Sequence, residues 1–333
     1  MKNVISLFLV LIAITVSAQE KHLKNIQQLT FGGDNAEAYF SFDGKNLAFQ
    51  SNNAAWDLKC DQIFNLNIKS ASKDTTYRPE LISTGLGRTT CAYFMPGDKQ
   101  ILYASTHVGG KECPPNPEPR ADHKYLWAIY PEFDIFIADL KGTIVKQLTN
   151  FEGYDAEATV SPDGKKMVFT STRNGDLDLY VCDIDGSNVK QVTHELGYDG
   201  GAFFSPDSKK LVFRASRPKT PEDIQEYKEL LSQGLVMPTN MEICVCNVDG
   251  SDFKQVTNLG KANWAPFFHP SGKKILFSSN HNSPKGYDFN LFMVNLDGSG
   301  LEQITKLSNF NAFPMFSPDG KKLVFSSNRN NHG

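Results

Sequence analysis

Short apolar segments alternate with polar turns from residue 35 to the end of the 333-residue chain, and one turn phrase recurs. An aromatic residue or Val is followed by Ser-Pro-Asp-Gly-Lys or a close variant, at residues 40–45, 94–99, 160–165, 204–209, 268–273 and 316–321. Pro fixes φ for a turn, Asp bonds to its own backbone, and Gly accepts positive φ. Because β-branched and aromatic residues flank each phrase, the pattern predicts six β-hairpins.

A third strand with alternating apolar residues follows five of these hairpins, at residues 62–66, 134–138, 178–182, 242–246 and 290–294. Asp-Gly-Ser turns at 185–187, 249–251 and 297–299 lead into a fourth strand that ends in Gln-Leu-Thr or a variant, at 147–149, 191–193, 255–257 and 303–305, with a weaker copy at 81–83. Repeats of four short antiparallel strands indicate propeller blades. We therefore predict an all-β fold, a six-bladed β-propeller with four-stranded antiparallel blades.

The strands do not divide evenly among six blades. A further Gln-Leu-Thr segment, at 28–30, precedes the first hairpin, and no third strand follows the last one. We expect the N-terminal strand to join the last blade and close the ring, which removes a free sheet edge. We also expect the last blade to be truncated, with the natural protein continuing for roughly ten more residues, the length of one more strand and turn.

The Ser-Pro-Asp-Gly-Lys turns, combined with Asp-Gly-Ser and Gln-Leu-Thr, closely resemble the TolB-like β-propeller repeat, a relative of the WD-type repeat. The resemblance covers nearly all of the chain after residue 18. TolB itself carries an α/β domain ahead of its propeller, whereas here the first hairpin comes almost at once. The resemblance therefore implies a propeller without that domain, and it does not carry over the role of TolB in envelope maintenance.

The first 18 residues have the features of a secretory signal peptide. Lys2 is followed by an apolar run at 4–16 that is too short to span a bilayer, and Val16-Ser17-Ala18 offers a cleavage site. We predict cleavage near Ala18, a signal peptide at 1–18, a propeller at 19–333 and a periplasmic or secreted location. No Cys follows the cleavage site for a lipid anchor, and no later segment is apolar enough to cross a membrane.

The net charge of −3 and the pI of about 6.2 leave no basic stripe, so nucleic acid is a poor partner. The long insertions, at 106–133 and 216–241, both follow second strands and should lie on one rim, which we predict to be the binding face. The second insertion contains a helix signal: Thr220 as the N-cap, Pro221, Asp223 and a stop at Gly234. Its apolar stripe of Ile224, Tyr227 and Leu231 fits packing on the rim, or contact with a partner.

Residues that lead into the first strands should meet at the mouth of the central channel. One equivalent position holds Asn35, Thr89, Asp155, Asp199, Asn263 and Asn311, a second holds Glu37, Cys91 and Glu157, and aromatic neighbours are Tyr154, Tyr198, Trp264 and Phe310. Such oxygens suit Ca²⁺, or hydrogen bonding to a sugar or peptide. Capping of tight loops and packing between blades are the alternative interpretation.

Six Cys residues in an exported protein suggest a disulfide. Cys182, Cys244 and Cys246 lie in apolar third strands and are expected to be buried thiols. Cys60, Cys91 and Cys113 lie near one rim, where a disulfide among them is plausible and its pairing open. The spacing of His107, Cys113 and His123 matches no zinc pattern.

The chain contains no nucleophile elbow, metalloprotease helix or phosphate loop. The resulting prediction is a non-enzymatic exported binding or scaffold propeller that holds a protein, peptide or glycan of the cell envelope. No cofactor is expected, and the one candidate ion is Ca²⁺ at the channel mouth. The alternative is a metal-dependent hydrolase or lactonase that uses the channel-mouth oxygens, by analogy with unrelated propellers. A sensor domain that serves a separate enzyme is a third possibility.

Overall fold

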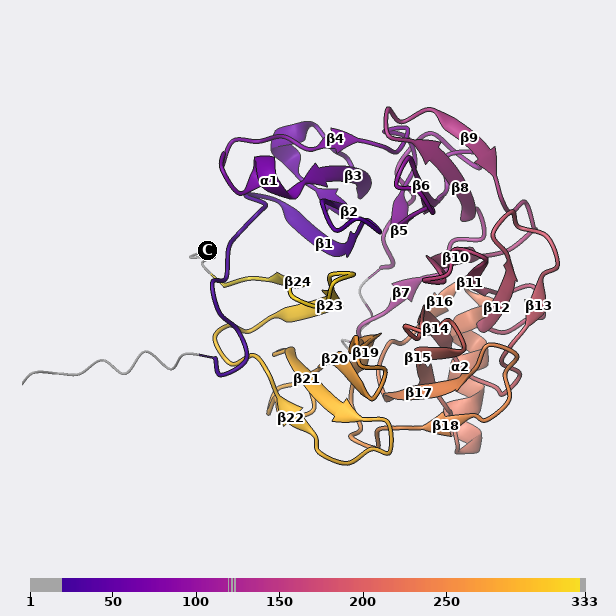
Figure 1. Ribbon diagram of the computed structural model, residues 1–333. Coiled ribbons are helices and arrows are strands. Elements are labelled where there is room, and N and C mark those ends of the chain that lie inside the picture. Colours follow the sequence, from indigo (N-terminus) through magenta and orange to yellow (C-terminus); the bar gives the residue numbers. More distant parts are fainter. Residues whose placement is uncertain (1–19, 119, 121, 123, 330–333) are drawn as a thin grey trace, which may run out of the picture.

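Five four-stranded antiparallel sheets are arranged around a central axis in the computed structural model, which describes residues 20–118, 120, 122 and 124–329 (Figure 1). Each sheet is a blade whose four strands run from the centre outward in chain order. The predicted signal peptide, residues 1–18, lies outside the described residues. The first strands of neighbouring blades contact one another, so they form the wall of the central channel.

The strand bounds follow the repeats of the sequence. Blade one contains β1 (Asp34–Phe40), β2 (Asn46–Asn52), β3 (Gln62–Asn67) and β4 (Glu80–Leu81). Blade two contains β5 (Thr89–Phe94), β6 (Gln100–Ser105), β8 (Asp134–Asp139) and β9 (Ile144–Gln147). Blade three contains β10 (Asp155–Val160), β11 (Lys166–Ser171), β12 (Asp178–Asp183) and β13 (Lys190–Gln191). Blade four contains β14 (Asp199–Phe204), β15 (Lys210–Ser216), β17 (Met241–Asn247) and β18 (Lys254–Gln255). Blade five contains β19 (Asn263–Phe268), β20 (Lys274–Ser279), β21 (Asn290–Asn295) and β22 (Glu302–Gln303).

The prediction of six four-stranded blades is wrong, because the structure has five. The sixth hairpin forms only a two-stranded sheet of β23 (Asn311–Phe316) and β24 (Leu323–Ser327), which lies between blade five and blade one. The predicted closure by an N-terminal strand is also wrong, since residues 20–33 form no strand. The physical reason is that no third strand follows β24 within the described residues, so residues 28–30 have no strand beside them to pair with.

Polar contacts hold the N-terminal segment in place instead. The Glu20 carboxylate accepts hydrogen bonds from the backbone N–H groups of Lys306 and Leu307, at 2.7 and 3.1 Å, and pairs with Arg329 at 3.0 Å. Burial raises the pKa of Glu20, but these bonds and the Arg329 charge outweigh it and lower the pKa overall. The start of the described chain is therefore tied to both sides of the β23–β24 sheet.

The recurring turn works as its composition predicts. In blade three the Ser161 hydroxyl donates to the Asp163 carboxylate at 2.6 Å, and the same carboxylate oxygen accepts from the backbone N–H of Lys165 at 3.1 Å. Gly164, between them, has φ +71°. The hairpin turns of blades one and four and the β23–β24 turn repeat the serine–aspartate bond. Local side-chain chemistry thus sets each reversal.

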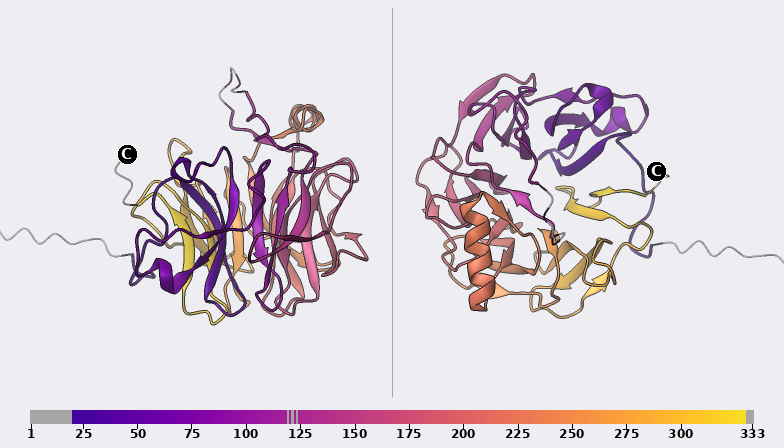
Figure 2. Two further views of the ribbon diagram at one scale, coloured as in Figure 1. Left: turned by 90° about the horizontal axis from the view of Figure 1, so that it is seen from above. Right: turned by 180° about the vertical axis from the view of Figure 1, so that it is seen from behind.

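The insertions rise from one rim, as Figure 2 shows. The opposite rim carries the hairpin turns and the loop between β3 and β4, where the backbone N–H of Ile68 donates to the carbonyl of Lys45 in the first hairpin turn. The predicted helix is present as α2 (Pro221–Ser232), with a capping box between Thr220 and Asp223. Within the insertions, β7 (Trp127–Ala128) pairs with β16 (Leu235–Val236), so the insertions of blades two and four meet over blade three. The two other helical segments, η1 (Ala54–Trp56) and α1 (Ile68–Ala71), are each about one turn. Among the described residues, no helix has the length and apolar character that crossing a bilayer requires.

Candidate functional site

A ring of six residues with positive φ surrounds the centre of the propeller. Every first strand carries a β-bulge, and the bulge residue has φ between 47° and 59°. These residues are Glu37, Cys91, Glu157, Gly201, Ala265 and Phe313. Only Gly adopts this conformation without cost, so five positions hold strained backbone.

All six bulge residues line one small central cavity of about 30 Å³. The sequence prediction that Glu37, Cys91 and Glu157 converge at the centre therefore agrees with their placement. A water-sized site needs about 10–15 Å³, so the cavity holds one or two waters or a single ion but no sugar ring. Any larger ligand has to bind above the cavity, on a rim.

The carboxylate of Glu157 is fully bonded within the wall of this cavity. One oxygen accepts from the Arg214 guanidinium and from the Tyr198 hydroxyl, the latter at 3.0 Å. The other oxygen accepts from the Thr170 hydroxyl at 2.7 Å and the Gly201 N–H at 2.9 Å. Burial raises the pKa of Glu157, but the Arg214 charge and these donors hold it below its usual value.

Arg214 is the functional-site residue that the sequence reasoning missed. It lies in β15 with 6% of its surface exposed, and its guanidinium lies over the rings of Tyr198 and Trp127, at 4.8 and 5.3 Å. The corresponding position of blade three holds Thr170, which is small and uncharged. The sequence feature that could have identified Arg214 is a charged residue inside the apolar stretch of a predicted second strand.

Glu37 has the opposite environment. Its Oε2 atom is buried and has no hydrogen-bond partner. Burial raises the pKa of Glu37 to about 7, although hydrogen bonding with Cys91 and the charge of Arg214 act against the shift. The neighbouring thiol is also perturbed, since burial raises the pKa of Cys91 well above its usual value. The two carboxylates in the cavity lining therefore have opposite pKa shifts: the pKa of Glu37 is raised and the pKa of Glu157 is lowered.

The residues predicted at the first position lie outside the cavity lining, bonded within the blades. Asp155 pairs with Arg173 at 2.6 Å, and Asp199 pairs with Arg217 at 2.7 Å. The amide positions Asn35, Asn263 and Asn311 each accept a hydrogen bond from the serine at the end of the adjoining second strand. Thr89 donates to the backbone carbonyl of Asp61 at 2.9 Å. These contacts fix the loops that lead into the first strands.

The predicted aromatic residues are covered by the insertions. Tyr154, Tyr198 and Trp264 are less than 10% exposed and belong to a hydrophobic cluster that includes residues of both insertions. The indole N–H of Trp264 donates to the backbone carbonyl of Pro238 at 2.9 Å, and its ring lies 5.2 Å from that of Trp127. Partly buried Phe310 packs at the edge of this cluster. These rings therefore support the insertions rather than facing solvent.

The residues at the centre do not fit the predicted Ca²⁺ site. Calcium takes six to eight oxygen ligands, whereas the oxygens of Glu157 are already engaged by Arg214 and three neutral donors, and Glu37 is the other carboxylate in the cavity lining. Across residues 20–329, apart from the three undescribed positions, no group of three or more His, Cys, Asp or Glu side chains is placed to hold a metal ion. We therefore derive no chemistry through a metal.

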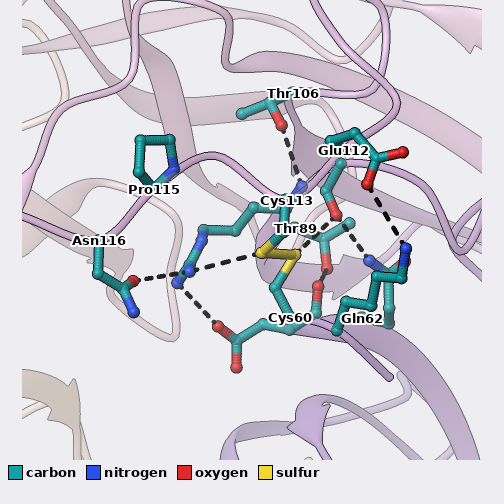
Figure 3. The surroundings of a disulfide bond; sticks show 12 residues. Cys60, Gln62, Thr89, Thr106, Glu112, Cys113, Pro115 and Asn116 are labelled. Carbon is teal, nitrogen blue, oxygen red and sulfur yellow. Dashed lines mark hydrogen bonds and ion pairs between the residues drawn. A yellow bond between two sulfur atoms is a disulfide. The ribbon is translucent and has the colours of Figure 1, made fainter. Parts of the chain in front are cut away.

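A disulfide links the rims of blades one and two (Figure 3). The structure pairs Cys60 with Cys113, whose Cα atoms lie 6.0 Å apart, and leaves Cys91, Cys182, Cys244 and Cys246 as free thiols. Near the bond, Arg88 donates to Asn116 at 2.8 Å and pairs with Asp61 at 3.2 Å.

The possible metal site at His107, Cys113 and His123 loses one ligand to this disulfide. The His107 ring lies against Phe136 and within 2.9 Å of the Ser105 hydroxyl, and His123 lies outside the described residues. Cys113 instead belongs to the Cys60–Cys113 disulfide, which anchors the start of the blade-two insertion to blade one.

The stripe of α2 packs onto the propeller. Of the stripe residues, Tyr227 is buried, Ile224 and Leu231 are partly buried, and Leu231 packs against the cluster beneath the insertions. Leu230, beside the stripe, is also buried. The Tyr227 hydroxyl donates to the Asp176 carboxylate at 2.5 Å. Of the two interpretations of the stripe, packing on the rim accounts for these residues.

Comparison with known proteins agrees with this architecture. The chain is similar to the structure of putative TolB from Agrobacterium tumefaciens, with 21% identity, 89% of this chain and 90% of that chain covered, and a TM-score of 0.61. It is similar to TolB from Acinetobacter baumannii, with 21% identity, 88% of this chain and 57% of that chain covered, and a TM-score of 0.54. A chain of a nidogen/laminin complex gives 12% identity, 83% and 81% covered, and a TM-score of 0.53.

These identities show a shared fold alone. No curated protein sequence matches the chain. The sequence pattern of the family described as "TolB beta propeller domain" matches residues 130–242 and 236–333, which together make up more than half of the chain. The chain therefore belongs to the TolB β-propeller family.

Proposed function

We propose that the protein is an exported, non-enzymatic binding protein that holds a protein partner on the rim carrying the insertions. Membership of the TolB propeller family supports a binding role in general terms. The observation that carries the proposal is the pairing of β7 with β16, which joins the two long insertions into one platform over a buried aromatic cluster. A preorganised platform loses little entropy when a partner binds.

Exposed apolar side chains on this rim support the proposal. Tyr287 is 81% exposed, Val108 64% and Tyr125 61%, and all three lie in loops between second and third strands. The hairpin turns of the opposite rim are instead rich in Asp, Lys, Gly and Pro. Solvent-exposed aromatic residues amid polar neighbours are typical of protein interaction surfaces.

An exported location accounts for two further features. The N-terminal 18 residues have the pattern of a signal peptide. The Cys60–Cys113 disulfide suits an oxidising compartment such as the periplasm. We therefore place the proposed partner in the cell envelope or outside the cell.

Site-specific photo-crosslinking in the native envelope tests the proposal. A photo-reactive residue in place of Tyr287 or Tyr125 should give a discrete adduct with one partner protein. The matched control replaces Lys273, which is exposed in the hairpin turn of blade five on the opposite rim. Adducts that form only from the residue in place of Lys273 would show that the partner binds the rim opposite the insertions, which contradicts the proposal. Absence of any adduct together with turnover of a substrate would exclude a non-enzymatic binding role.

A further inference from the structure

Two carboxylates share one cation at the centre of the propeller. Glu37 of β1 and Glu157 of β10 line the same cavity, and the charge of Arg214 in β15 acts on both. When Glu37 is protonated, the charges of Glu157 and Arg214 balance. An ionised Glu37 instead leaves one excess negative charge in a buried cluster, where the loss of hydration makes that charge costly.

The other ionisable groups that face Glu37 do not compensate this charge. They are Cys91, Asp61 and Tyr39. Asp61 has its own cation, Arg88, at 3.2 Å. Burial raises the pKa of the Cys91 thiol and that of the Tyr39 hydroxyl well above their usual values, so both groups stay neutral. Of the groups that face Glu37, Arg214 is therefore the cation that can pair with its ionised form.

Glu37 and Arg214 each carry a buried polar atom that has no hydrogen-bond partner in the described chain. Oε2 of Glu37 is an acceptor, and Nε of Arg214 is a donor. The Nη2 atom of Arg214 is already bonded to Glu157 and to the Tyr198 hydroxyl, the latter at 2.5 Å. Buried polar atoms are nearly always paired, so these two complementary atoms mark an interaction that is not made. Ionisation of Glu37 favours it, because charged partners form the stronger hydrogen bonds.

The Arg214 guanidinium also supports the platform on the insertion rim. It lies over the Trp127 ring at 5.3 Å, and the face of an indole ring attracts a cation. Trp127 lies in β7 and pairs with Val236 of β16. A turn of the guanidinium toward Glu37 therefore withdraws the cation from a strand of the platform.

We propose that Glu37 is the proton-binding site of a pH switch, in which ionisation of its carboxyl turns the Arg214 guanidinium away from Trp127 and loosens the pairing of β7 with β16. The switch regulates the proposed binding face and in that respect rests on the proposed function, since a looser platform holds a partner less tightly. Its test needs no partner, so failure of the switch and failure of the proposed function can be told apart.

The raised pKa of Glu37 sets the sign and the size of the effect. A carboxyl whose pKa is raised in the closed platform favours that form at low pH and opposes it as pH rises. The pKa is about 7 in the closed form, and we take 4.5, the ordinary value, for the loosened form. Linkage then raises the fraction of loosened platform about tenfold between pH 6 and pH 8.

Infrared difference spectroscopy tests the titration of Glu37. The spectrum of the parent minus that of Glu37→Gln should contain a protonated-carboxyl band at pH 6 that disappears by pH 8. The subtraction removes the bands of all other carboxyl groups. A difference spectrum without this band at pH 6, or one that keeps it at pH 8, would overturn the proposal.

Amide hydrogen exchange tests whether the titration reaches the platform. The exchange rate of the parent divided by that of Glu37→Gln cancels the intrinsic effect of pH on exchange. This ratio should rise about tenfold from pH 6 to pH 8 in β7 and β16, and much less in β12. The control Glu152→Gln, at an exposed position in the loop before β10, should exchange as the parent does at both pH values.

Two exchange results would count against the switch. A ratio in β7 and β16 that stays constant between pH 6 and pH 8 would show that the charge of Glu37 is not transmitted to the platform. An equal rise in β12 would show that ionisation weakens the whole propeller rather than the platform.

Discussion

The buried pair of Arg214 and Glu157 should dominate the response of the propeller to substitution at its centre. Arg214→Met keeps most of the side-chain volume and removes the charge. It leaves a Glu157 carboxylate with the hydroxyl groups of Tyr198 and Thr170 and the N–H of Gly201 as donors. Breaking a buried ion pair costs about 3–5 kcal/mol. Because three neutral donors still solvate the carboxylate, we expect a loss near the lower end, about 3 kcal/mol.

A double-mutant cycle separates the pair from its surroundings. Glu157→Gln alone should also cost about 3 kcal/mol, since it leaves Arg214 buried without its counter-charge. The double variant should lose less than the sum, with a coupling of about 2 kcal/mol. Shifts of the urea midpoint at constant m-value, with the disulfide intact, give the free energies of unfolding. A loss below about 1 kcal/mol for Arg214→Met, or additive single effects, would show that the pair is not coupled as its geometry indicates.

The pH dependence supplies a second check. In the parent protein Glu157 has a lowered pKa, so its contribution to stability is present above its unfolded pKa and is lost as pH falls through the folded value. Without Arg214, burial dominates and raises the pKa of Glu157. The ionised form then destabilises the fold, so the penalty of Arg214→Met should shrink between pH 7 and pH 5. A penalty that is constant or larger at pH 5 would contradict this.

Three further outcomes are expected. Glu37→Gln should increase stability above pH 7 by up to about 3 kcal/mol and flatten the stability profile between pH 4.5 and 7. The reason is that a carboxyl whose pKa is raised from 4.5 to about 7 destabilises the folded state as pH rises through that window. Urea unfolding measured as a function of pH checks this. Replacing Cys60 and Cys113 by Ala should cost about 4 kcal/mol, from the entropy of a loop that spans 53 residues, and calorimetry of the reduced parent should match the variant. Tyr227→Phe loses the bond to Asp176 and should speed amide hydrogen exchange in α2 without unfolding the blades.

Local chemistry explains what the sequence predicted well. The hairpin turns depend on a Ser and an Asp two residues apart, and the helix start depends on Thr220 and Asp223, so short windows contain the whole cause. The convergence of Glu37 and Glu157 followed from the repeat, because equivalent positions in a ring face the same axis.

Non-local pairing explains what the sequence did not predict. Glu157 meets Arg214 across two blades, and no single repeat contains both residues. The count of blades failed for a related reason. Six hairpins were counted as six blades, yet a blade needs four paired strands, and β23–β24 has only two. The sequence alone could not show whether the polar side chains at the first position, from Asn35 to Asn311, face the central channel or bond within the blades. The serine and arginine partners that decide this are found only in the structure.

The pairing of β7 with β16 has a consequence for how the chain acquires its shape. Ala128 pairs with Leu235 over blade three, so the insertions of blades two and four cover that blade together. The first of these segments is synthesised before blade three and the second after it. On a growing chain this pairing cannot form until residue 236 has emerged. Blades two, three and four should consequently become resistant to proteolysis in one step, late in synthesis, rather than one blade at a time.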